Sequence, residues 1–253
     1  MVAIPKDAAT IVLMRDPSGS RSGLEILMLQ RHMKSRFLPG AYVFPGGVLE
    51  AADYTREAEG ICQGLTSLQA HSIIRDASPP EKALGFFVAA AREAFEEAGI
   101  LLAYDPSGDL VAIAEEQRPR FTEYRAQVQK DPACFPGLIR KEQLALAADR
   151  LFYFAHWITP EIAPIRFDTR FFVAVAPPEQ KARHDALETT DSKWISPQQV
   201  LERHREGRLN VPFPTYCNVK ALAQFSGIEE VIASCRGKEV AAVQPLLDML
   251  NLG

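Results

Sequence analysis

Residues 92–100 read REAFEEAGI and place three glutamates on one side of a predicted helix. Glu93, Glu96 and Glu97 stand at positions i, i+3 and i+4, so their carboxylates share one face. Like charges at this spacing destabilise a helix by about 0.2–0.5 kcal/mol per pair, and the negative end of the helix dipole adds to the penalty. A helix selected for stability alone would carry lysine or arginine in its last turn. The stretch is therefore a candidate functional site.

Two interpretations of this acidic cluster are open. In the first, it is a solvated acidic face, partly offset by an ion pair between Arg92 and Glu96 one turn later. In the second, it is a binding site for a hard divalent cation, because clustered carboxylate oxygens are the ligands that Mg²⁺ and Mn²⁺ prefer. A bound cation would also remove the repulsion among the glutamates.

The helix that carries the cluster is predicted to run from Ser78 to about Ala98. Ser78 is the expected N-cap, Pro79 the first helical residue, and Glu81 the acidic residue three positions after the cap. Gly99 follows the last turn as a natural C-cap. The pattern therefore predicts a long helix whose acidic end is its carboxyl end.

Strand-like segments lie on both sides of this helix along the chain. The aliphatic stretches 8–15 and 24–31 flank the turn sequence DPSGSRSG and predict a β-hairpin. The other expected elements are strand-and-turn structure at 37–47, a loop with one short helix at 54–77, helices within 116–149, strands at 151–158, 166–176 and 192–195, a helix from Ser196 to near Gly207, and helices at about 215–225 and from about 239. This order predicts a mixed α/β (α+β) domain.

Composition excludes several classes of protein. The longest apolar run, residues 84–91, is far shorter than the roughly 20 residues of a transmembrane helix. The net charge of −4 is not that of a general nucleic-acid binder. The first residues lack the features of a signal peptide, and the four cysteines form no CxxC motif. We therefore expect a cytoplasmic protein with reduced thiols and no membrane or nucleic-acid partner.

The acidic stretch resembles the signature of Nudix hydrolases, G-x5-E-x7-R-E-U-x-E-E-x-G-U, in which U is aliphatic. Residues 92–100 match its second half. Its first half begins at Gly47, and Asp53 stands where the signature has its first glutamate. The x7 spacer has grown to the 38 residues 54–91, so the signature is split by an insertion. The resemblance implies a Nudix-type mixed β-sheet sandwiched between helices, with helical insertions.

A narrower resemblance is to the Nudix branch that includes a peroxisomal coenzyme A diphosphatase. Members of that branch also split the signature after VFPGG, which stands at residues 43–47 of this chain. A coenzyme A signature with basic residues and a glycine precedes FPGG there, and Arg31, Arg36 and Gly40 approximate it here. The resemblance implies substrate binding by Arg31, Arg36, Phe44 and Gly47.

Nudix hydrolases cleave a diphosphate linkage by attack of a metal-activated water on phosphorus, and the resemblance implies this chemistry here. The implied ligands of Mg²⁺ or Mn²⁺ are Glu93, Glu96, Glu97 and the carbonyl of Gly46. The implied catalytic residues are Glu96 as water-activating base, Arg92 as the residue that holds the glutamates, and Glu188 as a carboxylate from a late loop. Asp191 is the second candidate for that late carboxylate.

The expected function is hydrolysis of coenzyme A or acyl-coenzyme A to 3′,5′-ADP and phosphopantetheine or acyl-phosphopantetheine. Two alternatives stay open: hydrolysis of ADP-ribose, NADH or another nucleotide diphosphate, and a Nudix-fold binding or regulatory module. We expect one domain, 1–253, with insertions at about 54–82 and 103–150. The expected partners are a small-molecule nucleotide diphosphate and, as an option, a second copy of the chain in a homodimer.

Overall fold

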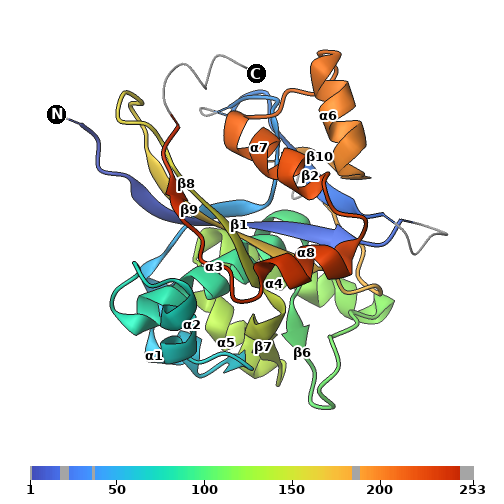
Figure 1. The fold of residues 1–253 in the computed structure, drawn as a ribbon. Helices are drawn as coiled ribbons and strands as arrows, with labels where there is room; N and C mark the ends of the chain where they lie inside the picture. The colour runs from blue at the N-terminus through green and yellow to red at the C-terminus, as the bar shows by residue number, and fades with distance from the viewer. Residues whose placement is uncertain (1, 18–22, 36–37, 184–188, 246–253) are drawn as a thin grey trace.

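The computed structural model describes residues 2–17, 23–35, 38–183 and 189–245. A mixed β-sheet crosses the middle of the molecule, with helices on both of its faces (Figure 1). Its strands follow the order β10 (Thr189–Ile195), β2 (Glu25–Arg31), β1 (Lys6–Arg15), β9 (Phe167–Val175), β8 (Phe152–Ile158) and β11 (Ala242–Val243). The short strands β3 (Tyr42–Val43) and β4 (Gly46–Val48) pair with β2 and β1. The predicted hairpin is confirmed, because β1 and β2 pair antiparallel.

Strand β1 is central to the fold because both of its faces are covered. Ile11 and Leu13 point into the core on one face of the sheet, and Val12 and Met14 point into the core on the other. All four side chains are fully buried. Strand β9 pairs parallel with β1 along nine residues, which fixes the register of the two. The predicted mixed sheet between helices is thus confirmed.

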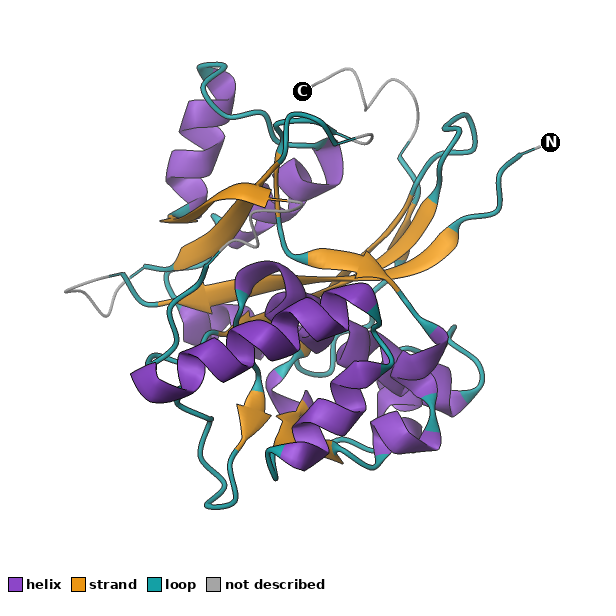
Figure 2. Cartoon of the chain, turned by 180° about the vertical axis from the view of Figure 1, so that it is seen from behind, coloured by secondary structure: helices purple, strands orange, loops and turns teal. Residues whose placement is uncertain are grey.

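Helix α3 (Pro80–Ala98) runs along one face of the sheet (Figure 2). The same side of the molecule holds α1 (Arg56–Glu59), α2 (Ser67–Ile73), α4 (Arg118–Lys130), α5 (Cys134–Lys141) and a second sheet of β5 (Cys62–Gln63), β7 (Ala145–Ala147) and β6 (Ala103–Tyr104). The opposite face is covered by α6 (Pro197–Arg205), α7 (Phe213–Leu222) and α8 (Ile228–Cys235). Short 3₁₀ helices are η1 (Ala51–Tyr54), η2 (Glu115–Gln117) and η3 (Ala148–Arg150). Within the described ranges, no helix is long and apolar enough to cross a membrane.

The start of α3 differs from the prediction by one residue. The N-cap is Pro79, with ψ of 175°, and not Ser78. A residue that precedes a proline is disfavoured in the helical region, so Pro80 keeps Pro79 extended and becomes the first helical residue itself. The predicted end is confirmed, because Gly99 caps the helix in the left-handed conformation at φ +68°.

Residues 144–149 were predicted helical and instead form β7 and the start of η3. The helical course stops after α5, where Gln143 has a φ of +57°. Leu146 then pairs with both Cys62 and Ala103, so long-range strand pairing overrides the local helix propensity.

Two further predictions were wrong in detail. Segment 54–77 holds two helices and a strand, and the signals for the second helix are in the sequence, because Thr66 and Gln69 form a capping box. The last described helix is α8, which begins at Ile228. A further helix was expected from about 239, but residues 239–245 are not helical and include strand β11, and the rest of that segment lies outside the described residues.

Candidate functional site

Arg92 is the anchor of the predicted site and is 1% exposed. Its Nε donates to Asp53 Oδ1 at 2.8 Å, and its Nη2 donates to Asp53 Oδ2 and to the carbonyl of Val48, both at 3.0 Å. Its Nη1 donates to Glu93 Oε1 at 2.8 Å and to Glu96 Oε1 at 2.6 Å. A guanidinium has five N–H donors, so every one of them has an acceptor. Arg92 is therefore a buried structural hub and not a surface ion pair.

Asp53 fixes Arg92 from the segment that opens the first insertion. It is 2% exposed, and its Oδ2 also accepts the backbone N–H of Glu50 at 2.9 Å, which closes a capping box on η1. Burial alone would lower the pKa of Arg92, but the hydrogen bond to Asp53 and the charges of Asp53 and Glu93 raise that pKa on balance. Asp53 thus occupies the signature position of the first glutamate as the partner of Arg92.

The acidic face of α3 is covered by strand β4. Glu93 and Glu97 are only 8% and 6% exposed, so the interpretation as a solvated acidic face is wrong. The N–H of Gly46 donates to Glu97 Oε2 at 3.3 Å. A Cβ at Gly47 would lie 2.7 Å from Cδ of Glu93, so only glycine allows this close approach of strand and carboxylate.

The charges of this cluster fit a divalent cation. Three carboxylates, those of Asp53, Glu93 and Glu96, bind one guanidinium. A fourth, that of Glu97, lies one turn after Glu93 on the same helix face and accepts the N–H of Gly46. Burial raises the pKa of Glu93 to about 7, the nearby charge of Glu96 adds to the rise, and Arg92 opposes it. A buried carboxylate that resists ionisation marks a site short of positive charge, and its oxygen donors suit Mg²⁺ or Mn²⁺.

The carboxylates are held by Arg92 and are not gathered around one point. Among the residues that the structure describes, no three acidic, histidine or cysteine side chains already form a metal cage. Arg92 instead draws one oxygen of Glu93 and one of Glu96 toward itself. The donor set is thus present, and its roles in metal binding stay predictions.

The remaining predicted residues lie in different places. Arg31 ends β2, where its N–H donates to the carbonyl of Ala41 at 2.9 Å. Phe44 is 3% exposed and packs in the core under α6 to α8, so its position gives the predicted contact with substrate no support. Arg36 and Glu188 lie outside the described residues.

Asp191, the second candidate for a late carboxylate, is part of a small cluster with two other residues. It pairs with Lys193 at 2.8 Å, and Tyr42 donates to its Oδ2 at 3.2 Å. Burial would raise the pKa of Asp191, but the bonds from Lys193 and Tyr42 lower it on balance. Its carboxylate is thus already committed to partners on β10 and β3.

One contact at the site was not expected from the sequence. Arg125 Nε and Gln129 Nε2, both on α4, donate to the backbone carbonyl of Glu96 at 2.7 and 2.9 Å. Their spacing of four residues places them on one helix face, but that pattern does not reveal the acceptor. The second insertion therefore braces the carboxyl end of α3.

Both the sequence and the fold of the chain are similar to those of known proteins. A family model described as the NUDT19 Nudix domain matches residues 5–84 and 71–222. Acyl-coenzyme A diphosphatase NUDT19 of Gallus gallus is 30% identical over 89% of this chain and 70% of its own length, and that of Homo sapiens is 28% identical over 91% and 68%. The chain matches 62% of the length of the Xenopus laevis protein of that name, at 28% identity. A crystal structure of a Nudix hydrolase from Alicyclobacillus acidocaldarius superposes with a TM-score of 0.75, at 25% identity, over 92% of this chain and 97% of the other.

Proposed function

Because this chain belongs to the NUDT19 Nudix domain family, we propose that it is a metal-dependent hydrolase of coenzyme A or acyl-coenzyme A. It would cleave the diphosphate linkage and release 3′,5′-ADP and phosphopantetheine or acyl-phosphopantetheine. The names of the vertebrate relatives support this substrate class. The observation that carries the proposal is the buried Arg92, whose five hydrogen bonds hold Glu93 and Glu96 in place beside β4.

The donors proposed to hold the cation are Glu93, Glu97 and the carbonyl of Gly46, with Glu96 as a further carboxylate. Bound Mg²⁺ or Mn²⁺ would neutralise the diphosphate and lower the pKa of a water molecule. Arg92 orients Glu93 and Glu96, and Asp53 holds Arg92. We assign proton acceptance from the attacking water to a carboxylate oxygen of Glu96, which is less buried than Glu93 and Glu97.

We further propose that residues 1–253 work as one catalytic domain whose insertions support the site. The first insertion begins at Tyr54, the last residue of η1, and Tyr54 packs closely against α3, where a Cβ at Gly85 would lie 2.7 Å from Cβ of Tyr54. The second insertion supplies the two side chains of α4 that bind the Glu96 carbonyl. Both insertions thus contact the helix that carries the carboxylates.

The test is a substrate panel assayed with Mg²⁺ and with Mn²⁺. Coenzyme A, an acyl-coenzyme A, ADP-ribose and NADH are incubated with the protein, and the products are identified by chromatography and mass. We expect 3′,5′-ADP from both coenzyme A compounds. Turnover of ADP-ribose or NADH alone would contradict the substrate class and favour a general nucleotide diphosphatase. No turnover of any compound would contradict the enzyme and favour a binding module.

A further inference from the structure

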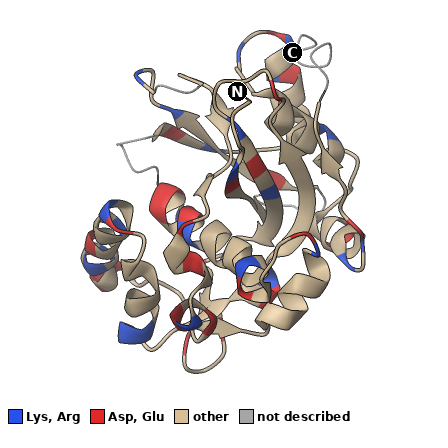
Figure 3. Cartoon of the chain, turned by 90° about the vertical axis from the view of Figure 1, so that its left-hand side faces the viewer, with Lys and Arg blue, Asp and Glu red and all other residues tan. Residues whose placement is uncertain are grey.

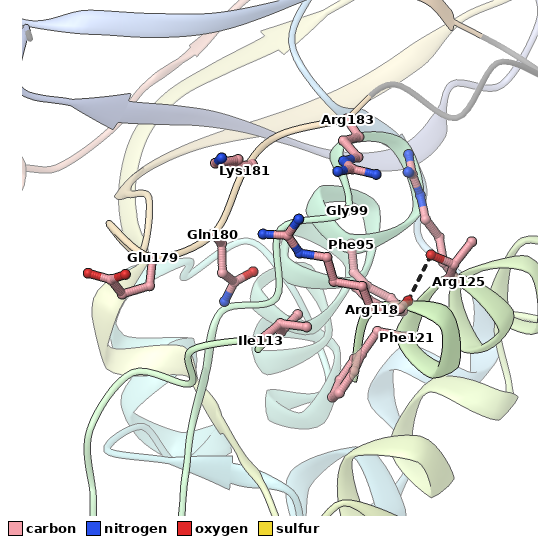
Figure 4. A pocket seen from close by; sticks show the side chains of 11 residues that line it. Phe95, Gly99, Ile113, Arg118, Phe121, Arg125, Glu179, Gln180, Lys181 and Arg183 are labelled. Carbon is pink, nitrogen blue, oxygen red and sulfur yellow. Dashed lines mark hydrogen bonds between the residues drawn. The ribbon is translucent and has the colours of Figure 1, made fainter. Parts of the chain in front are cut away.

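A small cavity of about 70 Å³ lies where the carboxyl end of α3 meets α4 and the segment that follows β9 (Figure 4). Phe95 and Gly99 form its α3 side. A water molecule occupies about 30 Å³ in the liquid, so the cavity has room for two waters or one tetrahedral oxyanion. One phosphate group would therefore fit.

The lining of this cavity is strongly basic in a chain of net charge −4. Arg118 and Arg125 come from α4, and Lys181 and Arg183 from the segment after β9. Among the lining residues that the structure describes, Glu179 supplies the one carboxylate. In Figure 4 the three arginine side chains lie around the end of α3. Four cations from two separate parts of the chain therefore converge on one small space.

The segment that carries Lys181 and Arg183 is held firmly in place. Gln180 accepts the N–H of Leu101 at 2.8 Å and donates to the carbonyls of Leu101 and Val111, each at 2.9 Å. The N–H of Arg183 donates to the carbonyl of Ala98 at 2.8 Å. The backbone that carries the two side chains is thus anchored to the end of α3 and the residues that follow it.

Two of these cations have partners within the protein. Arg125 uses its Nε to bind the carbonyl of Glu96, and Arg118 forms an ion pair with Glu115. Lys181 and Arg183 make no ion pair with any residue in the described ranges. The like charges that line the cavity repel one another, and an anion in the cavity would reduce that repulsion.

We propose that this cavity is a binding subsite for a phosphate monoester group that is not part of the scissile diphosphate. The planar guanidinium of arginine can donate two parallel hydrogen bonds to two oxygens of one phosphate group. Glu96 links the two sites, because its carbonyl is bound by Arg125 at the cavity and its carboxylate by Arg92 in the acidic cluster. The link to substrate rests on the proposed function, since coenzyme A carries a 3′-phosphate monoester beyond its diphosphate.

The first arm of the test uses inorganic phosphate and does not depend on catalysis. The full chain is melted in EDTA with increasing phosphate, against chloride at equal ionic strength. The variants are Arg118→Gln/Lys181→Gln, Lys181→Gln alone, and Lys130→Gln as a matched charge change at the exposed end of α4. We expect phosphate to raise the melting temperature of wild type and Lys130→Gln, and to raise that of the double variant much less.

If the double variant does not fold, the single Lys181→Gln variant is used in its place. We expect phosphate to raise the melting temperature of this single variant by an intermediate amount. Equal phosphate responses in wild type and in the cavity variants would overturn the subsite. Failure of wild type to respond to phosphate would overturn it as well.

The second arm identifies the source of the phosphate group. kcat/KM is measured for coenzyme A and for dephospho-coenzyme A. We expect the preference of wild type for coenzyme A to fall about tenfold or more in the double variant, as on loss of a charge-assisted contact, and to persist in Lys130→Gln. An unchanged preference, with phosphate binding lost, would support the subsite and assign it to free phosphate.

Arg31→Gln separates this subsite from the basic residues before β4. Loss of the coenzyme A preference in Arg31→Gln, with none in the double variant, would overturn the assignment to substrate. If wild type cleaves no coenzyme A compound, the proposed function fails, and the phosphate titration alone decides whether the subsite exists.

Discussion

Arg92 connects two segments that are far apart in the sequence. Its planar guanidinium can do this because it donates hydrogen bonds to both of them. Lysine at this position keeps the charge but offers three donors from one nitrogen, so it cannot reproduce the paired bonds to Asp53 and the bond to Val48. We predict that Arg92→Lys lowers the free energy of unfolding by about 1–3 kcal/mol, because buried acceptors lose their donors.

The measurement is urea denaturation without metal, with Arg120→Lys as the control. Arg120 pairs with Glu142 at 2.7 Å, but half of its side chain is exposed, so its substitution is expected to change stability by under about 1 kcal/mol. Equal losses in the two variants would contradict the role of Arg92 as a buried hub.

Residue patterns predict the acidic cluster well and its partners poorly. The spacing of Glu93, Glu96 and Glu97 places them on one helix face whatever the rest of the fold does. The contact between Asp53 and Arg92 spans 39 positions and depends on how η1 meets α3, which no local pattern encodes. The burial of the cluster could not be predicted either, since it depends on the approach of β4.

At the scale of elements, β4 and α3 lie so close together that a methyl group at Gly47 would clash with Glu93. We predict that Gly47→Ala displaces the carboxylate of Glu93 and lowers kcat/KM at least about tenfold, or 1.4 kcal/mol, in a protein that still folds. Gly137→Ala is the matched control, because a Cβ there meets nothing within 4 Å and alanine favours the helix. Full activity of Gly47→Ala in the hydrolysis assay would show that the approach of β4 does not matter for catalysis.

A second contact between elements is an ion-pair cluster that joins β1, β9 and the turn between α2 and α3. Arg170 is 3% exposed and pairs with Asp7, Asp76 and Asp168 at 3.1, 2.7 and 2.9 Å. Figure 3 shows acidic and basic residues side by side on the strands of the sheet. Burial would raise the pKa of Asp168, but His156 and Arg170 lower it on balance.

This cluster predicts a dependence of stability on pH. A carboxyl whose pKa is lowered in the fold stabilises the protein above its ordinary pKa of 3.8, and that contribution is lost as the pH falls toward its folded pKa. We predict that Asp168→Asn destabilises the protein by about 1–3 kcal/mol between pH 5 and 8, and that the difference from wild type shrinks below about pH 3.8. Urea unfolding at several pH values checks this. A difference that stays constant down to the acid transition would contradict it.

Elements with strong local signals could be predicted from the sequence. The hairpin, the helix ending at Gly99 and the helix capped by Ser196 all have clear turn or cap residues, and all three are found. Strand β7 could not be predicted, because its three residues, Ala145–Ala147, become a strand only by pairing with β5 and β6. Its isolated sequence, rich in alanine and leucine, favours a helix.

At the scale of the whole molecule, a divalent cation should stabilise the fold. A ligand that binds only the native state adds RT ln(1 + [L]/Kd), which is about 2.7 kcal/mol at 100 times Kd. We predict that millimolar Mg²⁺ or Mn²⁺ raises the melting temperature of wild type and has little effect on Glu97→Gln. If neither cation changes the melting temperature of wild type, the protein does not bind a cation at this cluster without substrate, and the prediction is wrong.

At this scale the order of strands and helices predicts a mixed α/β domain, and the resemblance to Nudix hydrolases implies the sheet between two helical layers. The placement of the insertions could not be predicted. Nothing in residues 103–150 indicates that α4 would bind the carbonyl of Glu96 or close a basic cavity with residues 179–183. These arrangements depend on side-chain contacts between distant segments, which become visible only in three dimensions.

The central claim is that the carboxylates of α3 carry metal-dependent hydrolysis of the diphosphate linkage. The most direct measurement is kcat/KM of Glu97→Gln for acyl-coenzyme A at saturating Mg²⁺, beside Glu116→Gln, which alters an exposed glutamate of η2. Glutamine is nearly the same shape, so the variant should fold while losing a proposed ligand. We predict a loss of more than about tenfold for Glu97→Gln, over 1.4 kcal/mol of transition-state stabilisation, and none for Glu116→Gln. Retention of more than about a tenth of wild-type activity by Glu97→Gln would contradict the account.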